Sequence, residues 1–202
     1  MACRACDRSS SDLDVRHVLT VNGIYRLPFG HGQRFVNSGW ASQVIGGWEL
    51  SGLAQARTGL PVNITMTRKA NVMLYGNTSS QRPDLVPGQS IYAADQTIDN
   101  WFNPAAFATP AKFTWGDLGR YIANGPGAFE IDTSLEKKFR LTERYTFDLR
   151  ASAFNLLNHP EFSNPASNIS KASFGTITSI LNDGATGSGA PRRIEFMLRL
   201  MF

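Results

Sequence analysis

The side chains that most often carry out catalysis or bind metals are few and scattered in this chain. The three histidines, His17, His31 and His159, are far apart, and no second ligand accompanies any of them at the spacing of a metal site. Cys3 and Cys6 form one Cys-x-x-Cys pair, but zinc requires two further ligands and a redox pair requires a βαβ context. Neither is present, so we interpret both cysteines as part of a tail. GxSxG, HExxH and a phosphate-binding glycine loop are also absent, and the sequence predicts no catalytic site, metal site or cofactor.

Glu130 and Asp132 are spaced as a pair of acid and base carboxylates would be, because residues two apart point to the same side of a strand. Opposite charges on neighbouring strands pair across a sheet, so a solvated wall of paired charges explains these residues without catalysis. We therefore expect that the chain is not an enzyme. The basic residues expected on the same side are Lys138, Arg140, Arg150 and Arg199.

Trp101 and Trp115 lie in segments rich in asparagine and glycine. Exposed indole rings in such loops can stack on sugars or peptides, so both residues are candidates for contact with a ligand. In the alternative interpretation the rings hold a long loop together.

The overall composition excludes a membrane-spanning helix, because no run of about 18 apolar residues occurs and the mean hydropathy is −0.20. It does not exclude a membrane-spanning strand, which needs only about ten residues with every second one apolar. The net charge is +4, but the lysines and arginines are scattered, with no run longer than two. We therefore expect no nucleic-acid partner.

Five segments alternate between apolar and polar residues with a period of two, which predicts β-strands. In the last one, Ile194, Phe196 and Leu198 alternate with Glu195 and Arg199. Prolines, which break the hydrogen-bond ladder of a sheet, lie outside all five segments. Asn22-Gly23 is a hairpin signal, but a turn there would mix apolar and charged residues on each face, so we expect a continuous strand. The predicted strands are about 15–27, 44–58, 129–140, 145–157 and 192–202.

The connections between these strands alternate in length: 28–43 and 141–144 are shorter, and 59–128 and 158–191 are long. Short periplasmic turns and long extracellular loops are typical of outer-membrane β-barrels. If the C-terminus is periplasmic, aromatic residues gather at that membrane interface as a girdle. The girdle residues are Tyr25, Phe29, Trp48, Phe139, Tyr145 and Phe147, with Trp40 and Phe202 nearby.

The order of several motifs resembles the late strands of TonB-dependent receptors of the Oar-like type. These motifs are DVRH at 14–17, YRLPFG at 25–30, GGWELSG at 46–52, RPDL at 82–85, WFNPAAF at 101–107, GPG at 125–127 and AFNLLNHPEF at 153–162. The final residues also resemble the signal that the barrel-assembly machinery reads in such proteins. The residues of this signal are Phe196, Leu198, Leu200 and Phe202.

The resemblance implies a receptor or transporter in the outer membrane of a Gram-negative bacterium, with a barrel of about 22 strands in the complete protein. Its implied partners are outer-membrane lipid, the barrel-assembly machinery, an unidentified transported ligand and, through N-terminal parts outside this sequence, the TonB system. We expect 12–202 to be the C-terminal barrel segment. Residues 1–11, which carry no signal-peptide pattern, are expected to be a disordered or non-native tail.

The predicted fold class is all-β: an antiparallel up-and-down meander of about five long strands with two long extracellular loops, an incomplete segment of a transmembrane β-barrel. The alternative is a soluble, secreted β-sandwich that acts as a binding or adhesion module, with the same strands packed face to face.

Overall fold

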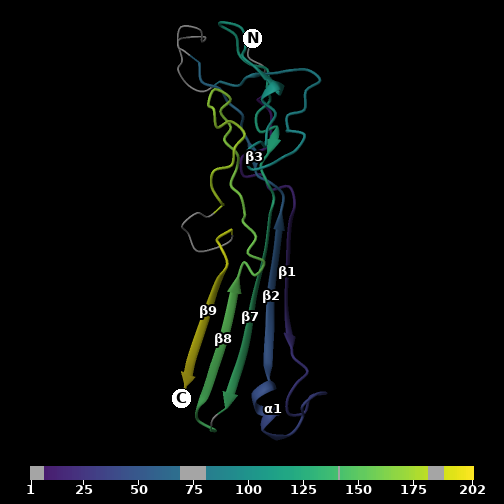
Figure 1. The fold of residues 1–202 in the computed structure, drawn as a ribbon, viewed down its shortest axis with the longest axis vertical. Helices are drawn as coiled ribbons and strands as arrows, with labels where there is room; N and C mark the ends of the chain where they lie inside the picture. Colours follow the sequence, from purple (N-terminus) through teal and green to yellow (C-terminus); the bar gives the residue numbers. More distant parts are fainter. Residues whose placement is uncertain (1–6, 69–80, 141, 182–188) are drawn as a thin grey trace. The chain divides into compact units, whose positions relative to one another are not determined.

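The computed structural model in Figure 1 describes residues 7–68, 81–140, 142–181 and 189–202. The chain divides into two compact units. One, which we call the sheet unit, comprises Val18–Ala56, Phe129–Glu161 and Gly184–Phe202. The other, the loop unit, comprises Met1–His17, Arg57–Ala128 and Phe162–Asp183. Each unit is described separately below.

The sheet unit is built on one five-stranded sheet with the order β1-β2-β7-β8-β9 (Figure 1). Strand β8 pairs with β7 on one side and with β9 on the other, and both pairs are antiparallel. At the end of β1, Leu27 N–H donates to the carbonyl of Trp48 at 3.0 Å. This arrangement confirms the predicted all-β meander of five long strands, and β1 and β9 are the edges of a sheet that is not closed. The strands are β1 (Val18–Arg26), β2 (Trp48–Arg57), β7 (Ala128–Arg140), β8 (Thr146–Phe154) and β9 (Arg193–Met201).

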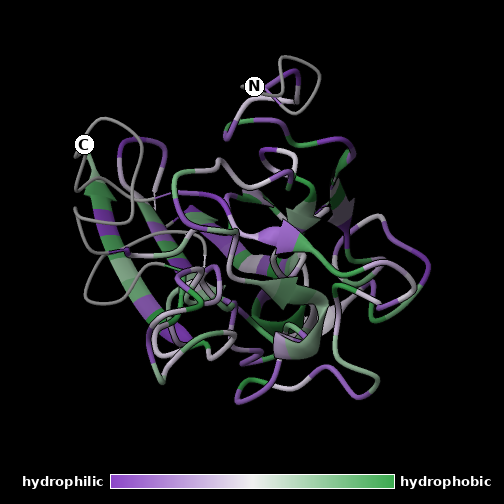
Figure 2. Cartoon of the chain, turned by 90° about the horizontal axis from the view of Figure 1, so that it is seen from above, coloured by the Kyte–Doolittle hydropathy of each residue, from purple (hydrophilic) through white to green (hydrophobic). Residues whose placement is uncertain are grey.

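The long strands of the described residues thus form one sheet, whereas the β-sandwich alternative requires two sheets packed face to face. Strand β1 passes through Asn22-Gly23 without a turn, as predicted. Viewed from above, β9 shows alternating hydrophobic and hydrophilic bands (Figure 2). The alternation of apolar and polar residues in the sequence therefore places them on opposite faces of the strand.

The predicted strand 44–58 is wrong at its beginning, because a short helix, α1 (Gly39–Ile45), occupies its first residues. Trp40 and Val44 are four residues apart, so they lie on the same face of a helix. Val44 and Trp48 are also an even number of residues apart, which is why the period of two extends the predicted strand back to residue 44. Helix α1 ends at Gly46, whose Cα lies so close to Gly30 that a Cβ on either glycine would overlap the other backbone. In the described part of the chain, no helix has the length and apolar character needed to cross a membrane.

The predicted strand 145–157 is also too long, because β8 ends at Phe154. Asn155 has a positive φ of 48°, a conformation that interrupts a strand. Its backbone N–H donates to Asp132 Oδ1 at 2.8 Å, and its amide group donates to the carbonyls of His159 and Ala190, both at 2.9 Å. The buried Asn155 side chain therefore replaces the ladder hydrogen bonds that a longer strand would form.

The loop unit shows that the two predicted long loops fold around a hydrophobic core of their own. Phe174, from the second long loop, stacks on Phe102 of the first with ring centroids 5.8 Å apart, and it meets Phe107 edge-on at 5.5 Å. The buried core residues are Val62, Ile64, Phe102, Ala106, Phe107, Leu118 and Ala123. The short elements around them are β3 (Pro61–Val62) paired with β6 (Ala123–Asn124), β4 (Asp84–Leu85) paired with β5 (Phe107–Ala108), and the turn η3 (Pro104–Ala106).

The predicted tail, residues 1–11, is described from Asp7 onward. Asp7 pairs with Arg82 at 2.8 Å and lies 3.8 Å from Arg120, so this part of the tail is held to the 57–128 segment within the loop unit. Cys3 and Cys6 lie outside the described residues.

Candidate functional site

Cross-strand pairing sorts the side chains of the sheet into an apolar face and a polar face. On the apolar face, Leu135 lies opposite Ala151 and Ala151 opposite Phe196, so one row crosses three strands. Because side chains alternate along each strand, the residues between them form the polar face. Other apolar-face residues are Ile131, Phe139, Phe147, Leu149, Ile194, Leu198 and Leu200.

Several charged residues on the polar face form ion pairs, as the sequence predicts for a solvated wall. Glu136 accepts from Arg150 at 2.7 Å and from Lys138 at 3.1 Å. On the neighbouring strands, Arg26 pairs with Glu49 at 3.2 Å. These contacts join β7 to β8 and β1 to β2, so the charges hold the strands in register.

Glu130 and Asp132, the candidate acid and base, each bind a backbone N–H group. A carboxylate oxygen of Glu130 accepts from Gly189 at 3.1 Å, and Asp132 accepts from Asn155 at 2.8 Å. Both carboxylates thereby fix the positions of segments at the ends of strands, which favours a structural role for them.

The residues of the predicted assembly signal lie along β9 and just beyond it. Phe196, Leu198 and Leu200 are 79%, 66% and 54% exposed, and the terminal Phe202 is 87% exposed. A contiguous apolar face that remains open in a folded chain marks an interaction surface. This face requires either lipid or another protein to cover it. On β1, Val18 and Ile24 depart from the pattern, because they share the side assigned to polar residues.

The predicted aromatic girdle lies at one end of the sheet, where β1 and β7 end and β2 and β8 begin. Phe139 lies directly opposite Phe147, with ring centroids 6.4 Å apart. Phe29 packs on Phe35 in the connection that follows β1, with centroids 5.9 Å apart. The other predicted members are in adjoining positions: Tyr25 in β1, Trp48 at the start of β2 and Tyr145 just before β8.

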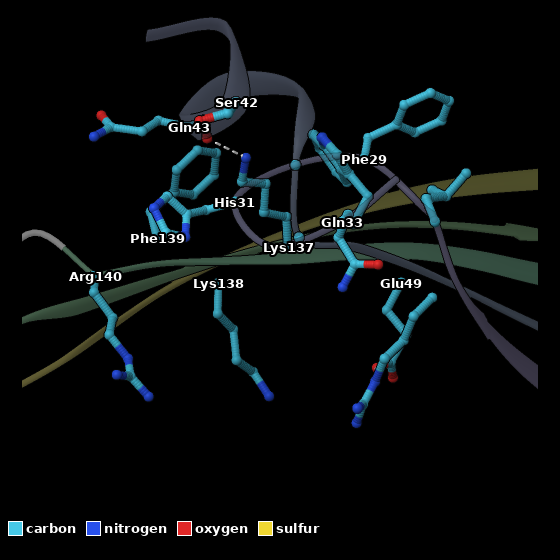
Figure 3. Close-up of a pocket in the computed structure, with 15 residues that line it drawn as sticks. Phe29, His31, Gln33, Ser42, Gln43, Glu49, Lys137, Lys138, Phe139 and Arg140 are labelled. Atoms are coloured by element: carbon cyan, nitrogen blue, oxygen red, sulfur yellow. Dashed lines mark hydrogen bonds and ion pairs between the residues drawn. The ribbon is translucent and has the colours of Figure 1, made fainter. Parts of the chain in front are cut away.

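A hollow of about 810 Å³ opens at this same end of the sheet (Figure 3). It is lined by the connection that follows β1, by α1 and by the ends of β2 and β7. Figure 3 shows Lys137 directed toward α1, whereas Lys138, Arg140 and Glu49 project from the other side of the sheet. The rim of the sheet is therefore apolar and helix-covered on one face and charged on the other.

Lys137 is the residue of this region that is missing from the predicted set. It occupies an apolar-face position opposite Leu149 and is only 4% exposed. Its ammonium group donates to the carbonyl of Gln43 and, at 2.8 Å, to that of Val44, and it lies 4.4 Å from the centroid of the Phe139 ring. The sequence marks Lys137 only as an exception to an apolar row; its partners become visible in the structure, where the buried cation finds the hydrogen-bond acceptors that it needs.

The histidines remain separate from one another. His17 N–H donates to Thr58 Oγ1 at 3.2 Å, His31 lines the hollow, and His159 Nδ1 lies 3.1 Å from Glu161 Oε1. Within the described ranges, no group of three potential ligands is arranged to hold a metal ion.

The two candidate loop tryptophans differ in their surroundings. The indole N–H of Trp101 donates to the Asn124 carbonyl at 3.0 Å, and its ring packs against the core of the loop unit. These contacts favour the interpretation that Trp101 holds the loop together. Trp115 is 39% exposed and keeps a ring surface that a ligand could contact.

Comparison with known proteins gives one family match. A family model described as an outer membrane beta barrel domain matches residues 2–195, which include β1, β2, β7, β8 and the beginning of β9. Searches of curated proteins and of solved structures gave no match. The apolar and polar faces of the sheet are the two faces that the wall of such a barrel requires.

Proposed function

The chain belongs to the outer membrane beta barrel domain family, and from this premise we propose that it is the C-terminal barrel portion of a TonB-dependent receptor. The family places the protein in the outer membrane. There the apolar face of the sheet faces lipid and the polar face lines the lumen. The five long strands of the described residues are fewer than the eight or so of the smallest closed barrels, so in this proposal further strands complete the wall.

The observation that carries the proposal is the shared core of the two long connections. Both follow strands that run in the same direction, β2 and β8, and Phe102 of one packs against Phe174 of the other. A barrel wall alone does not need ordered loops. A receptor does, because a ligand-binding surface must be held in shape before the ligand arrives.

The order of the motifs between DVRH at 14–17 and AFNLLNHPEF at 153–162 supports the more specific assignment to a TonB-dependent receptor. In this proposal the girdle end of the sheet is periplasmic and the loop unit is extracellular. Its partners are outer-membrane lipid, the barrel-assembly machinery, the TonB system through N-terminal parts outside this sequence, and a transported ligand. We assign it no enzymatic activity and no nucleic-acid partner.

The test is to express the complete gene that contains this chain in a Gram-negative host and to fractionate the envelope. We expect a heat-modifiable protein in the outer-membrane fraction that forms crosslinks with TonB in intact cells. An outer-membrane protein that never crosslinks to TonB would overturn the receptor assignment while leaving the family membership intact.

A further inference from the structure

Helix α1 lies on the apolar face of the sheet, the face that meets lipid. The position of Lys137 establishes this, because Lys137 shares its row with Leu149 and Leu198 and its ammonium group reaches the last carbonyls of α1. Trp48 Nε1–H donates to the Val44 carbonyl at 3.2 Å, so a second apolar-face residue holds the same helix end. The helix is therefore fastened to the outer surface of the wall.

Most of the exposed side chains of α1 are apolar, and Gln43 is its exposed polar side chain. Of its seven residues, Trp40, Val44 and Ile45 are 80%, 54% and 45% exposed, while Ser42 is buried. Tryptophan prefers the membrane–water interface, where its ring meets acyl chains and its N–H meets polar headgroups. The exposed side of α1 is thus continuous with a surface that already contacts lipid, and it has the composition of an interfacial segment.

The position of α1 also explains how Lys137 can be buried on the apolar face. A lysine on the lipid-facing side of a strand exposes a cation to a medium that cannot solvate it. The carbonyls at the C-terminal end of α1, which have no partners within the helix, solvate that cation instead. The rings of Phe139 and Trp48, at 4.4 Å and 5.6 Å, complete its surroundings.

We propose that α1 is a membrane-interface helix that contacts phospholipid beside the rim of the barrel wall, and that Lys137 is the positioning residue that fastens it there. The proposal rests on the contacts of α1 and on the outer-membrane family, and it does not depend on a receptor role. It adds a lipid-binding element outside the strands, in a connection that otherwise only joins β1 to β2.

The test uses the complete protein, with its native cysteines replaced by serine, reconstituted in phosphatidylethanolamine and phosphatidylglycerol vesicles. An environment-sensitive fluorophore is attached at Trp40→Cys and, for comparison, at Ser51→Cys on the polar face. We expect phospholipids with a shallow spin label to quench the probe at position 40, and aqueous iodide to quench the probe at position 51. Strong iodide quenching at position 40 without lipid quenching would overturn the proposal.

The matched variants Lys137→Met and Lys138→Met separate the two faces. Methionine suits the lipid-facing position of Lys137, so we expect the barrel to stay heat-modifiable while lipid quenching at position 40 is lost. Lys138→Met should leave that quenching unchanged. Unchanged quenching in a folded Lys137→Met protein would refute the role of Lys137. If Lys137→Met does not fold, the comparison of positions 40 and 51 in the otherwise unaltered protein still decides the location of α1.

Discussion

Lys137 and Lys138 are consecutive residues of β7 whose ammonium groups lie on opposite faces of the sheet (Figure 3). Lys137 is buried under α1 and binds backbone carbonyls, whereas the side chain of Lys138 is 60% exposed and pairs with Glu136. They differ because successive side chains of a strand point to opposite faces of the sheet. Lys137 thus holds a helix on the apolar face, and Lys138 joins a network of charges on the polar face.

Replacement of Glu136 by alanine should weaken the join between β7 and β8. Its carboxylate accepts from Arg150 at 2.7 Å, and its side chain is only 19% exposed. Loss of a charged hydrogen bond of this kind should lower the free energy of unfolding by about 1–2 kcal/mol, measured by urea titration in vesicles.

The control for Glu136 is Glu195→Ala, which removes the exposed pair with Arg193. An exposed ion pair contributes little, so this change should stay within about 0.5 kcal/mol. Equal effects of the two substitutions would contradict the network described for Glu136.

Asn155→Ala should be among the most damaging polar substitutions in the sheet unit. Besides its two donated bonds, the Asn155 side chain accepts from His159 N–H at 3.0 Å. Alanine would leave these partly buried backbone groups unpaired, at a cost of about 2–4 kcal/mol in unfolding free energy.

Asn158→Ala is the matched control for Asn155, because Asn158 also has a positive φ, 51°, but is exposed and accepts only one backbone bond in the described contacts, from Arg192. Both variants carry the same backbone strain. A stability loss as large for Asn158→Ala would show that the conformation matters and not the buried hydrogen bonds.

Phe196→Arg tests which face of the sheet meets lipid. Phe196 lies opposite Ala151 in the row that includes Leu135, near the middle of β7. A lipid-facing arginine near the bilayer midplane should destabilise the folded barrel by about 2–4 kcal/mol. The neighbouring change Met197→Gln, on the polar face, should be tolerated. Urea titration in vesicles measures both free energies of unfolding. If Met197→Gln is the destabilising change and Phe196→Arg is tolerated, the assignment of the two faces is reversed.

Gly59→Ala should disturb the loop unit and spare the wall. A Cβ at this position would overlap the carbonyl of Gly125, and backbone cannot move aside as a side-chain end can. We expect faster tryptic cleavage of the loops in intact cells, with the heat-modifiable barrel retained. Gly23→Ala, which meets open space in β1, should change neither property. Loss of the barrel in Gly59→Ala would mean that the loop unit is required to form the wall.

The sequence predicts those parts of the molecule whose residues repeat. Strand β9 and the placement of Phe139 and Phe147 on the apolar face follow from a period of two, because every second side chain must share a face. The core of the loop unit has no such period: Phe102 and Phe174 are far apart in the chain and meet only through irregular backbone. Lys137 interrupts an apolar row, and the sequence alone does not reveal the helix carbonyls that it binds.

The two edges of the sheet leave its hydrogen-bonding capacity unsaturated. Along β1 and β9, alternate residues direct their N–H and C=O groups to a side where no strand of the described chain receives them. In hydrocarbon each unpaired group costs several kcal/mol, whereas in water it costs almost nothing. Amide hydrogen exchange along β1 and β9 in the complete, inserted protein should therefore be as slow as along β7, because insertion of this sheet is energetically possible only together with the strands that pair with it.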